Sequence, residues 1–171
     1  MKGLLPRSVG LCLVVGLLFP TVAAQERKAV ASRGETFVVA VVRKSEIRVA
    51  ITTHEVHIGK PSDKGLEETR SSCTLSKYPC SVVDEIKIAI GGTPLFVPRS
   101  AFCDLADVSF AQLDADLQEA TLTLTGGDAS ESYIVRITFG ADRVKKRTLS
   151  SALSPDGLLE ETVYHVQVIG N

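Results

Sequence analysis

Apolar and polar residues alternate most regularly in residues 119–140, and this pattern predicts a β-hairpin at the centre of the fold. Side chains alternate between the two faces of a strand, so an apolar residue at every second position gives one buried face and one wetter face. Residues 120–125 and 133–139 both follow this rule. The seven-residue loop between them, residues 126–132, opens with Gly-Gly-Asp, which suits the positive φ angles and local hydrogen bonds of a turn.

Other segments of the chain also have strand-forming sequence. They are residues 36–43, 46–58, 82–90, 93–97, 107–113, 143–151 and 160–169. The first of them is apolar almost throughout, so we expect it to be buried on both faces or nearly so. Gly91-Gly92 predicts a two-residue turn, and the SPDG sequence at 154–157 predicts another. A short helical or irregular turn is expected after Pro98, and residues 59–72 have the composition of an exposed loop.

About nine short strands with close turns, and no long helix, predict an all-β fold. An antiparallel β-sandwich is favoured over a barrel-like meander, but the spacing of the strands is compatible with both. Residues 25–171 are long enough to form a single domain with a sizeable core. Within this domain, residues 25–34 are polar and basic, and we expect them to form a loose N-terminal lead.

The first 24 residues have the pattern of a signal peptide. Lys2 and Arg7 precede an uncharged, almost wholly apolar run at residues 9–19, and small residues stand before the expected cleavage site after Ala24. The run is shorter than the roughly 20 residues that span a bilayer, which favours cleavage over a retained anchor. Cys12 lacks the small preceding residue expected of a lipoprotein site. We therefore expect a periplasmic or secreted protein.

The charge balance makes a general nucleic-acid or membrane-surface binder a poor fit. The chain has 19 basic and 20 acidic residues, and removal of residues 1–24 leaves 17 against 20, a net charge of −3. The densest run of charge holds four cations, Arg143, Lys145, Lys146 and Arg147. A regular strand would place the first, second and fourth of these on one face.

This basic run has two interpretations. It is either a solvated face, partly neutralised by Glu160 and Glu161 on the following strand, or a basic stripe that docks an acidic protein or an anionic envelope polymer. Two acids do not neutralise four cations, which keeps the second interpretation open. Such a stripe would be a possible interaction surface of the protein.

Three cysteines follow the expected cleavage site: Cys73, Cys80 and Cys103. Export is compatible with disulfides, and a Cys73–Cys80 bond would close a short loop and stabilise the fold by roughly 2.5 kcal/mol. Pairing of Cys80 with Cys103 is the main rival, and three free thiols are a further alternative, because spacing does not fix connectivity. Left unpaired, Cys103 is expected to be a small buried hydrophobe. No nearby histidine marks it as a nucleophile.

The histidines do not form a metal motif. His54 and His57 lack the i, i+4 spacing of a zinc-protease helix, because Ile58 stands where the second histidine is required. On a strand they would point to opposite faces, and His165 has no ligand pattern beside it. The sequence also lacks a nucleophile elbow and a phosphate loop. We therefore expect no metal, no cofactor and no catalytic residue that a motif would identify.

Several segments together resemble a group of small exported bacterial proteins of unknown function. The segments are FVPRSAFCDL at 96–105, GGDAS at 126–130, SY at 132–133, RTL at 147–149 and EET at 160–162. They cover about half of the chain after the expected cleavage site. The resemblance implies an exported bacterial β domain and no particular activity.

Three functions fit these features. The first is an exported non-enzymatic binding or accessory module of the bacterial cell envelope, whose partner is a protein or an anionic envelope polymer. The second is a small secreted hydrolase with an active site assembled from scattered polar residues. The third is a purely structural envelope component. None of the three involves nucleic acid or a membrane span after signal cleavage.

Overall fold

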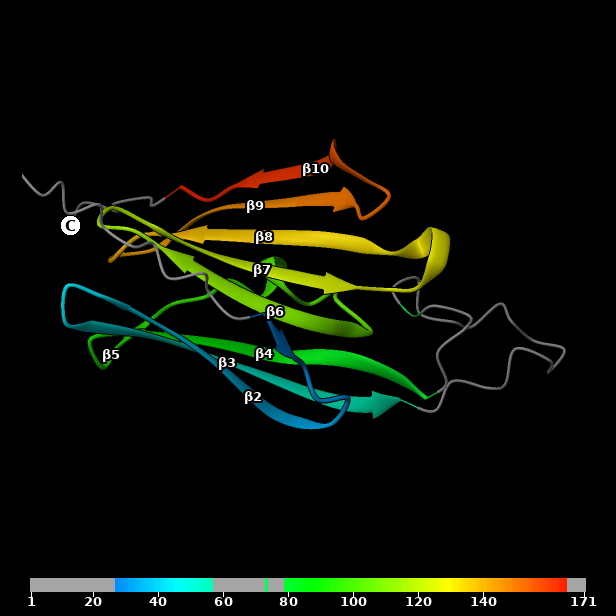
Figure 1. The fold of residues 1–171 in the computed structure, drawn as a ribbon, viewed down its shortest axis with the longest axis horizontal. Coiled ribbons are helices and arrows are strands. Elements are labelled where there is room, and N and C mark those ends of the chain that lie inside the picture. Colours follow the sequence, from blue (N-terminus) through cyan, green and yellow to red (C-terminus); the bar gives the residue numbers. More distant parts are fainter. Residues whose placement is uncertain (1–26, 57–72, 74–78, 166–171) are drawn as a thin grey trace, which may run out of the picture.

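A computed structural model of the chain describes residues 27–56, 73 and 79–165 (Figure 1). The expected signal peptide, residues 1–24, lies outside the described residues. So do His57, the loop predicted at 59–72 and the end of the last predicted strand beyond residue 165. No helix in the described part of the chain is long and apolar enough to span a membrane.

Two antiparallel sheets stack as the layers of a β-sandwich (Figure 1). The six-stranded sheet has the order β1-β6-β7-β8-β9-β10. Its strands are β1 (Lys28–Ala29), β6 (Val108–Ala115), β7 (Ala120–Gly126), β8 (Tyr133–Phe139), β9 (Val144–Ser151) and β10 (Ser154–Val163). The four-stranded sheet has the order β2-β3-β4-β5. Its strands are β2 (Gly34–Val42), β3 (Ser45–Val56), β4 (Cys80–Ile90) and β5 (Thr93–Leu95). The prediction of an all-β sandwich is confirmed.

The core lies between the sheets, on the apolar faces that the alternation predicted. In the central hairpin, Leu122 pairs with Ile137 and Leu124 with Val135, and all four side chains are fully buried. The loop of the hairpin contains a single 3-10 turn, η3 (Ala129–Glu131). A second 3-10 turn, η2 (Arg99–Ala101), lies in the connection from β5 to β6, where the sequence predicted a helical turn.

Strand β2 is buried on one face only, contrary to the prediction from its apolar sequence. Val38 and Ala40 face the core, whereas Val39 and Val41 lie on the outer face of the four-stranded sheet and are exposed. The sandwich has two layers, and nothing in the described part of the chain covers this face. The apolar run therefore leaves a hydrophobic surface on the outside of the sheet.

The N-terminal lead is more ordered than predicted, because part of it belongs to the six-stranded sheet. β1 pairs with β6, and the N–H of Val30 donates to the carbonyl of Ser109 at 3.0 Å. The guanidinium of Arg27 stacks on the ring of Phe110 at 4.0 Å. Sequence polarity did not reveal these contacts because two-residue edge strands carry no periodic signal.

The last hairpin also differs from the prediction. The chain reverses at residues 152–153, and the SPDG segment lies inside β10 rather than in a turn of its own. Ser154 pairs with Ser151 and Leu158 with the neighbouring Ser150, so the residues between them form an irregular bulge. The turn-forming residues 154–157 therefore form a bulge in an edge strand and not a separate turn.

The predicted Cys73–Cys80 disulfide is present, with Cα atoms 5.7 Å apart. Cys103 is the free cysteine, as predicted, but it is exposed rather than buried. It follows η2, where the short helical turn directs Phe102 and Leu105 into the core. Residues three apart share a face of such a turn, so Cys103 points away from the core.

Candidate functional site

Four turns gather at one end of the sandwich (Figure 1). They are the β2–β3, β4–β5, β6–β7 and β8–β9 connections, and they come from both sheets. The β9–β10 turn lies at the opposite end (Figure 1), and so does the disulfide, because Cys80 begins β4 while the β4–β5 connection follows its other end. Turns held on a rigid scaffold are common places for binding sites, so this end is a candidate for one.

A cavity of about 210 Å³ lies among these turns, and we call it the loop-end cavity. Its apolar lining comes from both sheets: Val42, Ile47, Ile90, Ala120 and Phe139. Its remaining lining residues come from three of the turns and their flanks: Arg43, Ser45, Asp116, Leu117, Gln118, Glu119, Gly140 and Ala141. An apolar cavity of about 150 Å³ holds benzene, so this one has room for a single ring or a branched aliphatic group.

The β2–β3 turn brings Arg43 to the cavity in a strained backbone conformation. Val42 pairs with Ser45, which leaves Arg43 and Lys44 as a two-residue turn with φ angles of 48° and 78°. Positive φ at both positions is typical of a type I′ hairpin, which favours Asn-Gly. A side chain with a Cβ costs roughly 1–2 kcal/mol in this region. Strained residues gather at binding sites, and Arg43 makes no ion pair with any described residue.

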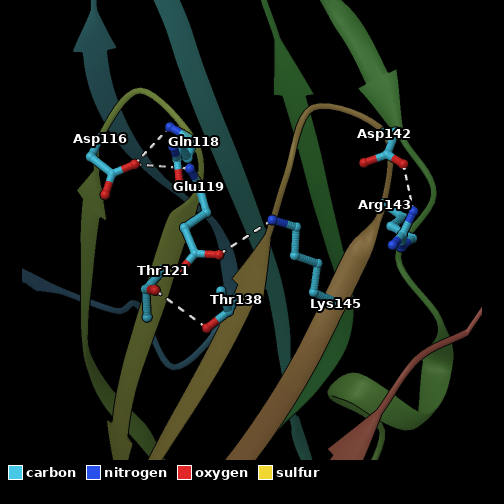
Figure 2. Close-up of polar contacts among 8 residues, drawn as sticks. All are labelled: Asp116, Gln118, Glu119, Thr121, Thr138, Asp142, Arg143 and Lys145. Atoms are coloured by element: carbon cyan, nitrogen blue, oxygen red, sulfur yellow. Dashed lines mark hydrogen bonds and ion pairs between the residues drawn. The ribbon is translucent and has the colours of Figure 1, made fainter.

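The β6–β7 turn is held by Asp116 (Figure 2). Its carboxylate accepts hydrogen bonds from the N–H groups of Gln118, at 2.7 Å, and Glu119, at 2.9 Å. The bonds from the Glu119 and Gln118 N–H groups lower the pKa of Asp116. The tip of the turn presents Leu117, which is 62% exposed and lines the cavity.

A second polar contact fixes the adjacent part of the rim. The ammonium of Lys145 lies 3.3 Å from the carboxylate of Glu119, which joins β9 to the β6–β7 turn (Figure 2). Below it, the hydroxyls of Thr121 and Thr138 lie 3.3 Å apart on the paired strands β7 and β8. The loop-end cavity therefore has an apolar lining, two acids held by local contacts, and one arginine without an acidic partner among the described residues.

The structure does not bring the four predicted cations onto one surface. A bulge interrupts the β8–β9 ladder, because Thr138 pairs with Lys146 and Phe139 with Val144. The extra residue is Lys145, so Arg147 turns inward while Lys146 remains outside. The expected alternation fails here because the sequence pattern contains no sign of the bulge.

Each of these cations has its own acidic partner. Arg143 pairs with Asp142 at 2.8 Å, Lys145 with Glu119 at 3.3 Å, and Lys146 with Glu161 at 3.6 Å. The structure thus supplies more acids than the two that the sequence suggested. This removes the excess of positive charge on which the basic-stripe interpretation rested.

Arg147 forms a buried ionic cluster. Its side chain is 2% exposed, and its guanidinium donates to Asp104 at 2.5 Å and to Glu160 at 2.6 Å. The contact with Glu160 was expected from the sequence, but the one with Asp104 was not, because Asp104 lies 43 residues away in the β5–β6 connection. The cluster fastens that connection to β9 and β10. The Nε atom of Arg147 is buried and has no hydrogen-bond partner among the described residues.

The histidines lie apart from the loop-end cavity. Nδ1 of His54 is 2.7 Å from the carboxylate of Asp84 on the neighbouring strand, and both side chains are about half exposed. His165 is also exposed. Within residues 27–56, 73 and 79–165, no three His, Cys, Asp or Glu side chains are grouped so that they could hold a metal ion.

Comparison with known proteins gave no match. No protein family, no curated protein and no solved structure is significantly similar to this chain.

Proposed function

We propose that this protein is an exported, non-enzymatic binding module of the bacterial cell envelope, and that its loop-end cavity receives one apolar group of the ligand. The observation that carries this proposal is the cavity itself, with apolar walls from both sheets and three turns at its opening. A pocket with a few placed polar groups is the usual form of a binding site. The cavity is smaller than most whole-ligand pockets, so it suits a ring or side chain that anchors a larger molecule.

The polar groups of the cavity favour binding over hydrolysis. Among the lining residues that the structure describes, Ser45 carries the only hydroxyl, and none is a histidine that could act as its base. Asp116 is occupied by backbone N–H groups, and Glu119 by Lys145. Arg43 is the lining cation that remains available for an anionic group. A ligand with an apolar group and a nearby carboxylate or similar anion therefore matches the cavity best.

Export rests on two separate observations. The Cys73–Cys80 disulfide is typical of proteins in oxidising compartments, and the first 24 residues have the pattern of a cleaved signal. Intact-mass analysis of the protein made in a secreting host tests this, with Gln25 as the expected first residue. A mature chain that begins at residue 1 or 12 would contradict it.

A fragment titration tests the cavity. The mature protein, labelled with nitrogen-15, is titrated with phenylacetate and with benzyl alcohol, and amide shifts are followed by NMR. We expect both fragments to shift amides at residues 42–47, 117–120 and 139–141. Phenylacetate should bind more tightly, because its carboxylate can pair with Arg43.

Ala141→Phe is the matching variant, because Ala141 is exposed and lines the cavity, so a large side chain there can fill the opening. Ala152→Phe makes the same change in the β9–β10 turn at the other end of the sandwich and is the control. Binding should be lost in the first variant and retained in the second. Equal binding to both variants would refute the loop-end cavity as the site.

A further inference from the structure

A second concave surface lies against β4 and is separate from the loop-end cavity. It has a volume of about 980 Å³, and we call it the β4 groove. One wall consists of six consecutive β4 residues, 84–89, and the other includes Pro94, Phe96, Val97 and Phe102. Consecutive residues of a strand point to opposite faces. A wall made of six in a row therefore includes the edge of the strand, where its backbone groups lie.

This part of the β4 edge has no neighbouring strand among the described residues. β5 pairs only with Ile88, Ala89 and Ile90. At the other end, the N–H of Val83 donates to the carbonyl of Leu105, and Val82 forms an isolated bridge with Ala106. Residues 84–87 lie between these two contacts. An open strand edge of this kind is a template for pairing with another chain.

The groove also exposes apolar side chains. Phe96 is 82% exposed, the highest value among the large hydrophobic residues that the structure describes, and Pro94 beside it is exposed too. Phe102, in the same wall, is buried. Aromatic side chains next to an open strand edge suit an extended peptide, which can insert apolar side chains while its backbone pairs with the strand.

The charges of the groove indicate which peptide fits. Lys87 lies 2.9 Å from Glu85, so this pair is locally neutralised. Arg48 stacks on the ring of Phe37 at 4.1 Å, and neither it nor Arg99 makes an ion pair with a described residue. The lining acid Asp84 contacts His54, which leaves Glu35 as the one lining acid without an ion pair to a described residue, against two such arginines. Acidic side chains on the bound segment would complement them.

We infer that the β4 groove binds an extended acidic and apolar peptide segment of a partner protein by strand addition to residues 84–87. Main-chain hydrogen bonds to β4 supply the pairing, and contacts with Phe96 and the two arginines supply the selectivity. This inference does not depend on the loop-end cavity, and either site can be refuted without the other.

Three synthetic peptides test the inference on the mature protein. The first is the acetylated and amidated heptapeptide TVEVDVT, the second is TVKVKVT, and the third is the first peptide with N-methyl groups on alternate amides. We expect the first to bind saturably, with amide shifts at residues 84–87, and to weaken as salt is raised. The lysine peptide should bind at least about tenfold more weakly. The N-methylated peptide should lose binding, because it keeps the side chains but not the backbone donors.

Arg99→Glu provides the protein-side test, with Arg136→Glu on the outer face of the six-stranded sheet as its control. The first change should weaken TVEVDVT binding at least about fivefold, and the second should leave it unchanged. Equal binding of the N-methylated peptide, or no saturable binding of TVEVDVT up to about 1 mM, would overturn the inference. The inference would also be overturned if the protein dimerised with rising concentration and Arg99→Glu abolished the dimer. The groove would then bind a second copy of this chain.

Discussion

The ring of Tyr133 occupies the space where a side chain on Gly126 would lie. The two residues pair across β7 and β8, and a Cβ on Gly126 would overlap the phenol ring. The hydroxyl of Tyr133 then donates to the carbonyl of Ala106 at 2.6 Å, just before β6. The backbone of Gly126 does not adopt a positive φ, so conformation does not require a glycine here. The glycine is required because the Tyr133 ring fills the space of a side chain.

Gly126→Ala is therefore expected to destabilise the fold by about 1–3 kcal/mol, the usual cost of overpacking. Chemical denaturation measures the change. The control is the same substitution in a Tyr133→Ala background, where the clash is absent and the additional cost should fall below about 0.5 kcal/mol. Equal costs in both backgrounds would show that the ring and the glycine are not coupled.

Stability at high pH gives a second test of this contact. Burial of the phenol, the largest cause, raises the pKa of Tyr133 well above its ordinary value near 10. Above pH 10 the unfolded chain releases the phenolic proton while the folded chain keeps it, so the free energy of unfolding falls as pH rises. Tyr133→Phe has no proton to release. We expect a smaller loss of stability between pH 9 and 11 in this variant than in the wild type, measured by urea unfolding.

The strands were predictable from sequence because their periodicity is local. The central hairpin, the inward faces of β3 and β4 and the Gly91-Gly92 turn all follow from residues within a few positions of one another. The candidate site was not predictable in the same way. Arg43 and Asp116 reach one cavity only because both sheets end at the same level. The one available sequence signal of this site was Arg43-Lys44. These two basic residues occupy a two-residue turn where Asn-Gly is the expected sequence.

The bulge at Lys145 explains why the predicted placement of Arg147 on one face with Arg143 and Lys145 was wrong. One extra residue reverses the alternation of faces, so Arg147 enters the core while a regular strand would have kept it with Arg143. Asp104 then meets Arg147 from a distant loop. Neither the bulge nor this long-range partner leaves a periodic trace in the sequence.

The buried cluster around Arg147 predicts an asymmetric response to mutation. The double variant Asp104→Asn/Glu160→Gln leaves a buried guanidinium without its anions, and breaking such pairs costs about 3–5 kcal/mol. Both carboxylates are about half exposed, so solvent screening should reduce the loss to the lower limit of this range or below it, about 2–3 kcal/mol. Arg147→Met removes the charge together with its unpaired Nε and should cost less than the double variant. A larger loss for Arg147→Met, measured by denaturation, would contradict this account.

The cysteines can be distinguished by reactivity and by stability. Cys103 is exposed and should react with a thiol reagent in the folded protein, whereas Cys73 and Cys80 should react only after reduction. Cys80→Ser should lower the free energy of unfolding by roughly 2.5 kcal/mol, because it opens a closed loop. Cys103→Ser should change it by less than about 0.5 kcal/mol, as is usual for surface substitutions. Peptide mapping that links Cys103 to Cys73 or to Cys80 would refute the Cys73–Cys80 pairing.

The strained turn at the loop-end cavity predicts an exchange of stability for binding. Arg43→Asn/Lys44→Gly installs the sequence that a type I′ hairpin favours and should stabilise the fold by about 1–2 kcal/mol. The same change removes Arg43, the cation that we propose to pair with the anionic group of the ligand. Phenylacetate binding should therefore weaken while benzyl alcohol binding persists. Proteins commonly retain such unfavourable residues where function requires them.

Lys44→Gly alone is the matched control, because it relieves strain in the same turn and keeps Arg43 at the cavity. It should raise the unfolding midpoint without changing the affinity for phenylacetate. If the double variant bound phenylacetate as tightly as the wild type, Arg43 would have no role in binding, and the positive φ angles of this turn would be a feature of the hairpin alone.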